Sequence, residues 1–367
     1  MTLEQIIEQI KPANEASMEA AKDRWMSVAK PLFSLGKLES TVIKIAGIKG
    51  TSDYSLNKKG LIIMCADNGV VEEGVTQTGQ EVTAIVADNF TKEAASVAIM
   101  SKTAGVDLFP IDIGMVTDVP SVTRPEHKIM YGTNNFAKEP AMTSQQALRA
   151  INIGIQLVKE KKEAGYDILA TGEMGIGNTT TSSAIAAVLM DTEVELVTGR
   201  GAGLSGSGLE KKIQVIKDAI DNYGLRDLQT GSGADHKNSV HPEDVLEVMA
   251  AVGGLDIAGM TGLFLGGAIY GVPIVIDGFI SSVAALCAVR IAPFAADYML
   301  PSHVSKEPAG RMMLDALGVS PLLTCDMCLG EGSGAIAMLP ILEMGLNVYK
   351  QMGTFKENDI EAYKVLQ

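Results

Sequence analysis

The sequence predicts an α/β protein with a doubly wound, mostly parallel sheet and a small helical domain built from the two chain ends. Short β-rich runs end in acidic residues or glycine, as in LIIMCADNG, VDLFPIDIG, YDILATGEMG and VPIVIDGF. Each run is almost continuously apolar, which is typical of parallel strands that are buried on both faces. Segments of helical composition separate the runs, and both ends of the chain have helical spacing of apolar residues.

Helices are expected at the N-terminus and between the strands. Over the first forty residues apolar side chains recur three or four positions apart, from Ile6 to Leu32, and Pro12 interrupts the pattern. The segments expected to connect the strands are 80–100, 143–163, 210–223 and 242–255. In a sheet built this way, ligands collect at the carboxyl ends of the strands.

The chain after Ser333 is again helical in composition, although Pro340 demands a kink or a restart. The two terminal helical segments can pack together as one small domain. The expected division assigns residues 1–60 and 333–367 to this small domain and residues 61–332 to a large catalytic domain.

Composition and charge exclude several classes of protein. The chain has 367 residues, and a hydrophobic fraction of 47% excludes disorder as its main state. Its formal net charge is −14, whereas electrostatic binding to nucleic acid or to an anionic membrane needs a basic face. The uncharged stretch 257–276 is rich in glycine, so a helix, a turn and a buried strand explain it better than a membrane span. We therefore expect a soluble protein.

The four cysteines, Cys65, Cys287, Cys325 and Cys328, are too few and too scattered for a disulfide scaffold. Cys325 and Cys328 form a C-x-x-C, but no second Cys or His pair follows at the spacing of a structural zinc site. Two small residues in a packed connection are the simpler interpretation, so no metal is expected and the role of the pair stays open. The cytoplasm is the expected compartment.

Two glycine-rich segments are candidate phosphate-binding loops. GEMGIGNTTT begins at Gly172, where Asn178 or a following Thr can cap a helix whose free N–H groups suit an anion. GRGAGL begins at Gly199 and is followed by Lys211 and Lys212. Neither is a Walker A loop or a dinucleotide fingerprint, and each taken alone is also compatible with an ordinary turn.

Two further segments carry polar side chains. PSHVSKEPAGR offers hydroxyls, two cations and His303, although a single His beside a turn is more often a structural hydrogen-bonder than an acid or base. LGEGSG holds Glu331 between two glycines. A carboxylate with few competing charges can act as a general base, while an isolated Gly-Glu-Gly is more often a polar turn.

Together these strings resemble the nicotinate-nucleotide–dimethylbenzimidazole phosphoribosyltransferase family. The likeness runs from about Ala66 to Gly353 and comprises, in order, ADNGV, EEGV, GTNNFAKEPAMT, GEMGIGNTTT, GRGAGL, MTG, DGFISSVAAL, PSHVSKEPAGR and LGEGSGAIAMLPILE. The resemblance implies transfer of the 5-phosphoribosyl group of nicotinate mononucleotide to an aromatic base, giving nicotinate and an α-riboside phosphate for the cobamide nucleotide loop. It implies no cofactor or metal, because the leaving group is already a pyridinium.

The resemblance also implies roles for individual residues. Glu331 would be the base that takes the acceptor's proton, and Glu173 would be a second polar contact near the acceptor. The positions implied for the phosphate are Gly175, Gly177, Gly201, Gly203, Lys212 and Ser305. The remaining expected substrate contacts are Asn178, Asp277, Thr76 and Gln80. A homodimer is implied, with a heterodimer with a paralogue as the alternative.

The chain departs from the family pattern at three places. Asn68 stands where many members have His, Thr76 to Gln80 read TQTGQ instead of the commoner Ser-x-Tyr-Pro-Gln, and Cys328 stands where Arg is frequent. These departures leave the acceptor open among dimethylbenzimidazole, another benzimidazole, a purine and a phenol, whose proton has a pKa of about 10. A non-catalytic partner subunit and an unrelated sugar-phosphate-binding protein are the alternatives. The presence of both Glu331 and Glu173 favours an enzyme.

Overall fold

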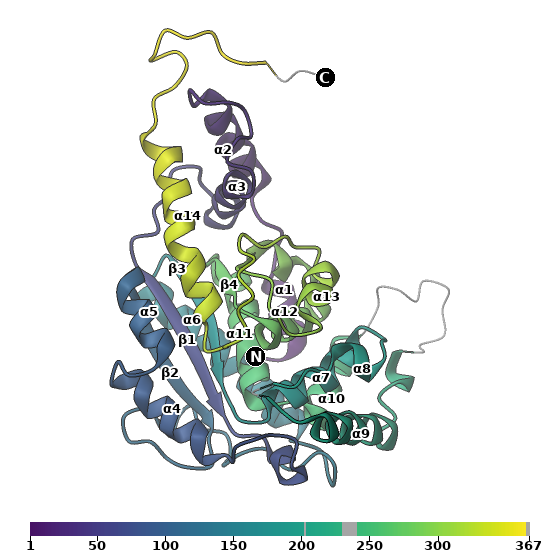
Figure 1. Ribbon diagram of the computed structural model, residues 1–367. Helices are drawn as coiled ribbons and strands as arrows, with labels where there is room; N and C mark the ends of the chain where they lie inside the picture. Colours follow the sequence, from purple (N-terminus) through teal and green to yellow (C-terminus); the bar gives the residue numbers. More distant parts are fainter. Residues whose placement is uncertain (202, 230–240, 365–367) are drawn as a thin grey trace.

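The computed structural model describes residues 1–201, 203–229 and 241–364 (Figure 1). Its sheet has five strands in the order β2-β1-β3-β4-β5, and every neighbouring pair is parallel. The strands are β1 Lys59–Ala66, β2 Val106–Gly114, β3 Ile168–Met174, β4 Ile274–Ile276 and β5 Met299–Pro301. The four apolar runs are therefore strands as expected, whereas the short strand β5 was not foreseen.

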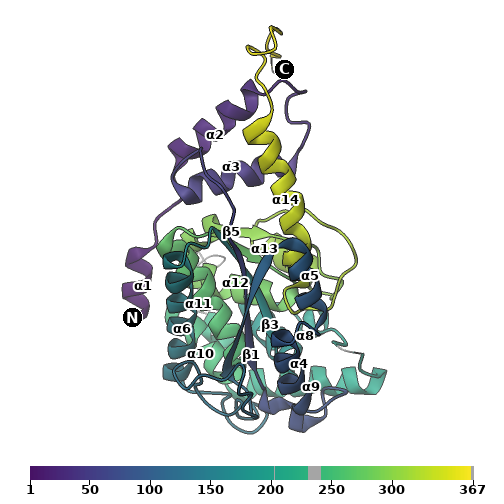
Figure 2. The ribbon, with the colours of Figure 1, turned by 90° about the vertical axis from the view of Figure 1, so that its left-hand side faces the viewer.

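Helices cover both faces of the sheet, which confirms the doubly wound α/β prediction (Figure 2). One face carries α4 Glu81–Thr91, α5 Ser96–Ala104 and α14 Ser333–Gln351. The other face carries α6 Ser144–Glu163, α10 Pro242–Val252 and α11 Leu255–Tyr270. Five further helices pack next to one another, and α12 joins this group to β3 and β4. They are α7 Asn178–Leu189, α8 Val194–Val197, α9 Gly206–Asn222, α12 Phe279–Ile291 and α13 Gly310–Ala316.

The observed helices differ from the expected ones in two places. The segment 80–100 forms two helices, because the chain turns between them, with Glu93 in the left-handed region at φ 54°. The tail forms the single helix α14, which continues through Pro340 without the restart that the proline suggested. Short 3₁₀ segments at Gly69–Glu73, Asp227–Gln229 and Pro293–Tyr298 complete the described elements.

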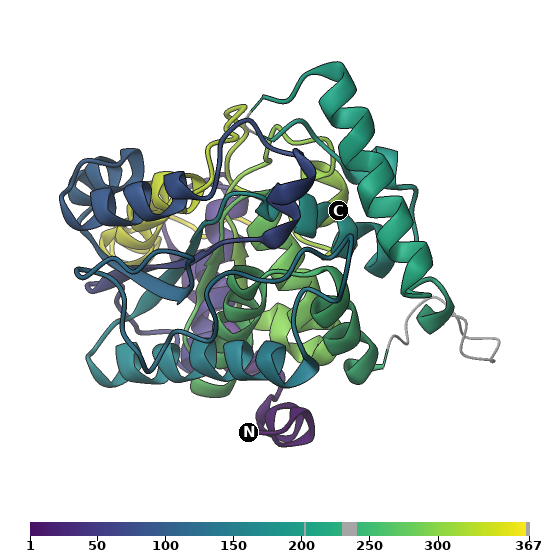
Figure 3. The same cartoon turned by 90° about the horizontal axis from the view of Figure 1, so that it is seen from below.

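Helices from the two terminal segments of the chain pack together at one end of the molecule. The helices α2 Glu15–Ser27 and α3 Lys37–Lys49 pack on each other, and α3 contacts α14 (Figures 1 and 2). The ring of Trp25 lies 5.2 Å from the ring of Tyr349, which ties α2 to the end of α14. The first helix, α1 Leu3–Gln9, lies apart from them against α11, and the Met1 amino group donates to Asn152 of α6 (Figure 3). The division into two domains stays a prediction.

The uncharged stretch 257–276 forms most of α11, a turn and β4, as expected. Gly262 explains part of its glycine content, because a methyl group there would overlap the backbone of α6 at Ile151. Gly154 of α6 faces the backbone of α11 at Gly259 equally closely. Gly271 then ends α11 in the left-handed conformation at φ 64°, which a residue without a Cβ adopts at little cost. Among the residues that the structure describes, no helix is long and apolar enough to cross a membrane.

Candidate functional site

A pocket of about 300 Å³ lies at the carboxyl ends of the strands, where the sequence places its special residues. Loops after β3, β4 and β5 form its wall together with the segment that leads into α14. It brings together seven of the predicted site residues, Glu173, Gly175, Asn178, Gly201, Asp277, Ser305 and Glu331. Residues from separate sequence strings thus meet in one place.

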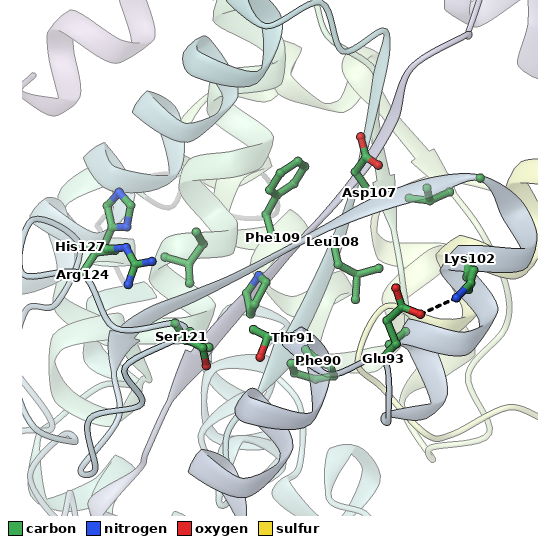
Figure 4. A pocket seen from close by; sticks show the side chains of 16 residues that line it. Phe90, Thr91, Glu93, Lys102, Asp107, Leu108, Phe109, Ser121, Arg124 and His127 are labelled. Atoms are coloured by element: carbon green, nitrogen blue, oxygen red, sulfur yellow. Dashed lines mark hydrogen bonds and ion pairs between the residues drawn. The ribbon is translucent and has the colours of Figure 1, made fainter.

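A larger hollow of about 720 Å³ lies elsewhere, along the outer edge of β2 (Figure 4). Phe90, Leu108 and Phe109 are among the residues that line it, with Leu108 and Phe109 on opposite sides of β2, and Lys102 pairs with Glu93 at 2.5 Å (Figure 4). None of the predicted site residues lines it. The smaller pocket is therefore the candidate functional site.

Five predicted residues do not line this pocket. Three of them form hydrogen bonds with other parts of the protein, and a fourth caps a helix. The Thr76 hydroxyl donates to the carbonyl oxygen of Thr78 at 2.8 Å, and the Gln80 amide donates to that of Asn68 at 3.2 Å. The carbonyl oxygen of Gly203 accepts a hydrogen bond from Gln77. Gly177 is the N-cap of α7, with φ 95°. The structure therefore gives Thr76 and Gln80 no contact with the pocket.

Lys212, the fifth of these residues, lies behind the pocket wall. The residue is fully buried, and its ammonium group donates to the Thr179 hydroxyl at 2.9 Å and to the carbonyl oxygen of Gly199 at 3.1 Å. Burial lowers the pKa of Lys212 to about 8, against the opposite effect of Glu307. Thr179 lines the pocket and Lys212 does not. The lysine therefore acts on the pocket only indirectly, by holding Thr179 and the loop at Gly199.

The N-terminus of α7 forms one end of the pocket. Gly175, Thr179 and Gly201 line this end together with Ser305 from the segment after β5. A helix N-terminus carries the positive end of the helix dipole, which suits an anion. In α7 the N–H groups of Asn178 and Thr180 already donate to the carbonyl oxygens of Gly175 and Gly177. The expectation that Asn178 or a threonine caps α7 is wrong, because Gly177 takes that position and the Asn178 side chain turns toward buried carboxylates.

Glu173 ends β3 as a buried carboxyl group. The Asn178 amide nitrogen donates both to Glu173 and to Asp256, the latter at 3.1 Å. Burial raises the pKa of Glu173 to about 8, and the charge of Asp256 adds to the effect, while the hydrogen bonds from Asn178 and from the Glu331 backbone oppose it. Glu173 is thus largely protonated at neutral pH, and a protonated carboxyl group can donate a hydrogen bond.

Glu331 lies in an unusual turn. The residues Gly330, Glu331 and Gly332 have φ angles of 85°, 62° and 92°, all in the left-handed region, where a residue with a Cβ loses about 1–2 kcal/mol. The Glu331 carboxylate accepts a hydrogen bond from the Val97 amide at 3.4 Å. Burial raises its pKa, the Val97 bond opposes this, and the charge of Asp277 raises it further. Glu331 is therefore a carboxylate with increased proton affinity at the pocket surface.

Asp277 follows β4 and is buried, and its two oxygens are occupied. They accept hydrogen bonds from the backbone N–H groups of Gly332 at 3.1 Å and Ala335 at 3.0 Å. Burial raises the pKa of Asp277 to about 6, while these bonds oppose the increase. Asp277, which the sequence led us to expect as a substrate contact, lines the pocket but is hydrogen-bonded to the beginning of α14.

The sequence did not single out several residues of the site. Thr179, Phe279 and Glu307 line the pocket, and Asp256 lies behind it. The only signal for Asp256 was a charge at the start of a buried helix, and its partner Asn178 lies 78 residues away in the chain. His303, considered as an acid or base, lines the pocket, and its Nδ1 lies 3.0 Å from the Ser302 hydroxyl. Burial lowers the pKa of His303.

Comparison with known proteins identifies the group to which this constellation belongs. A family model described as "Phosphoribosyltransferase" matches residues 10–360. A protein of Ruminiclostridium cellulolyticum named nicotinate-nucleotide–dimethylbenzimidazole phosphoribosyltransferase is 44% identical over 367 residues, all of both chains. The chain belongs to this phosphoribosyltransferase family.

Other members of the family agree over nearly the whole chain. The protein of the same name from Acetivibrio thermocellus is 42% identical over 98% of each chain. The crystal structure of CobT from Thermus thermophilus has a TM-score of 0.85 and 34% sequence identity, over 95% of this chain and all of the other. The family resemblance inferred from the sequence strings is confirmed.

The sequence suggested that Cys325 and Cys328 lie in a packed connection, and this expectation is wrong. Cys325 and Cys328 are both free and exposed, and Cys328 lines the pocket next to Leu329. Within the described parts of the chain, no three His, Cys, Asp or Glu side chains are grouped so that they could hold a metal ion. The polar groups around the pocket include carboxylates, hydroxyls, an imidazole, an amide and the N–H groups of α7.

The buried carboxyl groups predict a stability that falls as the pH rises. Burial raises the pKa of Glu173 to about 8 and those of Asp256 and Asp277 to about 6. Between pH about 4, where such groups ionise in an unfolded chain, and pH about 8, these three groups bind more protons in the folded protein than in the unfolded one. They outnumber His303, whose lowered pKa acts in the opposite direction. The free energy of unfolding should therefore decrease over this range, by at most about 1.4 kcal/mol per pH unit for each proton.

Urea unfolding between pH about 5 and pH about 8 measures this dependence. Glu173→Gln removes one titrating group, so its curve should be flatter between pH about 6 and pH about 8 than that of the wild type. Glu361→Gln, in the exposed tail, is the matched control and should leave the curve unchanged. Stability that rises with pH over this range in the wild type would contradict the prediction.

Proposed function

We propose that the chain transfers the 5-phosphoribosyl group of nicotinate mononucleotide to an aromatic base, dimethylbenzimidazole or a related lower-ligand base. The products are nicotinate and an α-riboside phosphate for assembly of the cobamide nucleotide loop. One observation carries the proposal: a single pocket joins the N-terminus of α7 to two carboxyl groups of unequal proton affinity. The names of the full-length relatives support the same reaction.

The nucleotide's phosphate would bind at the end of the pocket where Gly175, Gly201 and Ser305 meet the start of α7. Glycines at this end let the backbone approach the phosphate oxygens closely. The buried Lys212 would support the site with its charge, and it would hold Thr179 and the Gly199 loop in place. The ribose would then point toward the carboxyl groups at the other end.

The chemistry needs little besides orientation and one base. The bond between C1 of the ribose and the pyridinium nitrogen breaks, and its electron pair neutralises that nitrogen, so nicotinate leaves without an acid. A ring nitrogen of the acceptor forms the new bond to C1, and the acceptor's proton passes to a carboxylate. Holding the two rings in line supplies much of the rate enhancement, and the positioned base supplies the rest.

We assign the base to Glu331 and the orienting contact to Glu173. Glu331 is partly exposed to the pocket, and its raised proton affinity suits it to accept a proton near neutral pH. Glu173 already holds a proton under those conditions, because burial raises its pKa to about 8, so it can donate a hydrogen bond to the acceptor or to the leaving carboxylate. Two acids at one site thus take different roles because their surroundings differ.

We infer further that the enzyme acts in the cytoplasm as a homodimer. Exposed apolar side chains on one face of the molecule support association, since Ile85 of α4, Ile99 of α5 and Met344 of α14 are all more than half exposed. A heterodimer with a paralogue is the alternative. Light scattering of the chain expressed alone distinguishes the two, because only a homodimer forms without a second protein.

Incubation of the purified protein with nicotinate mononucleotide and a panel of bases tests the proposed function. The panel contains dimethylbenzimidazole, benzimidazole, adenine and phenol, and chromatography measures the riboside phosphates that form. We expect dimethylbenzimidazole or a related benzimidazole to be converted. Preferred conversion of phenol would assign a phenolic acceptor, and no conversion of any base would indicate a non-catalytic partner subunit.

Glu331→Gln should reduce turnover by about 10²–10⁴-fold, the usual loss for a positioned general base. The amide keeps the shape of the side chain, so nicotinate mononucleotide should still bind, as calorimetry would show. Glu173→Gln should have a smaller effect, because an amide can still donate the hydrogen bond that we assign to Glu173. Near-normal turnover in Glu331→Gln, together with an inactive Glu173→Gln, would reverse the two assignments.

Lys212→Ala should weaken binding of nicotinate mononucleotide by about 10- to 100-fold, because it removes the bonds that hold Thr179 and the Gly199 loop at the phosphate end of the pocket, and hydrogen bonds to charged groups contribute about 1.5–3 kcal/mol. Binding of the free aromatic base should change much less. Lys211→Ala is the matched control, because Lys211 is the exposed neighbour on the same helix. Equal losses for nucleotide and base would place the phosphate elsewhere.

A further inference from the structure

The carboxylate of Asp277 joins the end of β4 to the beginning of α14. Its Oδ2 accepts the N–H of Gly332 and its Oδ1 accepts the N–H of Ala335, at 3.1 and 3.0 Å. A negative charge at this place also stabilises the helix, because the N-terminus carries the positive end of the dipole. The residue is 3% exposed. Both oxygens are therefore used in holding the backbone.

The backbone that Asp277 holds is the turn that carries Glu331. Gly330 and Gly332 adopt the left-handed region readily, but Glu331 carries a Cβ, so its conformation persists only where the surroundings enforce it. The N–H of Glu331 donates to Glu173, the N–H of Gly332 donates to Asp277, and a methyl group on Gly172 would meet the carbonyl oxygen of Glu331 at 2.5 Å. The ends of β3 and β4 thus clamp the turn from two sides.

Asp277 is itself held by neighbouring strands. Its N–H donates to the Ser281 hydroxyl at 3.1 Å, and Ser281 lies 2.6 Å from the hydroxyl of Thr171 on β3. Its carbonyl oxygen accepts the Ser302 hydroxyl, which follows β5, at 3.1 Å. The carboxylate therefore has a fixed position relative to three strands, and through Gly332 this position is passed on to Glu331.

We propose that Asp277 is a positioning residue and not a substrate contact: its carboxylate anchors the turn that presents Glu331 to the acceptor. The proposal rests on the proposed function, because Glu331 is the base of that reaction. Within the part of the chain that the structure describes, no other side chain accepts a hydrogen bond from the backbone of residues 332–335.

The pKa of Glu331 distinguishes this role of Asp277 from simple support of the fold. The titratable groups that share the pocket with Glu331 are Asp277, Glu173, His303, Glu307 and Cys328, while α5 contributes the neutral amide of Val97. The negative charge of Asp277 raises the pKa of Glu331. Removing that charge should shift the titration of Glu331 to lower pH, and support of the fold alone would not.

Asp277→Asn is the variant that tests the proposal. The amide cannot accept both N–H groups, so the turn loses one anchor, and kcat should fall by about 10²-fold, as for a reacting group displaced by about 1 Å. The KM for nicotinate mononucleotide should change little, and the acid limb of the kcat profile should move to lower pH. Asp112→Asn is the matched control, since Asp112 is also buried at a strand end and accepts the Met115 amide at 2.8 Å.

NMR titration of the ¹³C-labelled glutamates gives a readout that needs no turnover. The Glu331 signal, assigned from Glu331→Gln, should titrate at lower pH in Asp277→Asn than in the wild type and in Asp112→Asn. If the wild type transfers phosphoribosyl to no base, the proposed function fails, whereas an unshifted Glu331 titration overturns the role of Asp277. A raised KM with unchanged kcat would make Asp277 a substrate contact and would also overturn it.

Ser281→Ala provides a second variant in case Asp277→Asn does not fold. It removes the acceptor of the Asp277 N–H and leaves the charge of Asp277 in place. We expect a lower kcat with an acid limb at the same pH as in the wild type. A wild-type kcat in Ser281→Ala would count against the anchor, because the position of Asp277 would then have no effect on the base.

Discussion

The site depends on the contact between the Asp277 carboxylate and the first turn of α14. The strands of the sheet are parallel, so their carboxyl ends share one edge, and the segment after Leu329 must be held against that edge. The buried charge of Asp277 is satisfied there by backbone N–H groups of α14. One contact thus satisfies a buried acid, starts a helix and fixes the turn at Glu331.

The same edge explains why two neighbouring acids differ in their affinity for protons. Glu173 lies within an apolar core and faces Asp256 across one amide, so its neutral form is favoured. Glu331 stands on the turn outside the sheet and is only partly buried, so burial favours its neutral form less strongly. The fold therefore separates a hydrogen-bond donor from a proton acceptor mainly by their different burial, and the charged and hydrogen-bonding neighbours of each group add to the difference.

Periodicity in the sequence was enough to predict the parallel sheet, its two helical layers and the helices at the chain ends, because these follow from long apolar patterns. It did not reveal β5, since Met299–Pro301 is not part of a longer β-rich run such as the one that contains β4, or the break at Glu93. For the site, the sequence motifs correctly placed the candidate residues at the carboxyl ends of the strands. The direction of a side chain is a tertiary property, so the burial of Lys212 behind Thr179 and the partner of Asn178 could not be inferred from spacing.

The departures from the family pattern bear on the acceptor to different degrees. Thr76 and Gln80 are bonded away from the pocket, and Asn68 lies behind it with its amide on the carbonyl oxygen of Ile176. Cys328 alone among these positions lines the pocket. Leu329 and Glu331 line the same pocket, so position 328 belongs to the surroundings of both the acceptor and the carboxylate that we assign as the base. Among the three departures, the cysteine is therefore the one whose side chain is placed to affect the choice of acceptor.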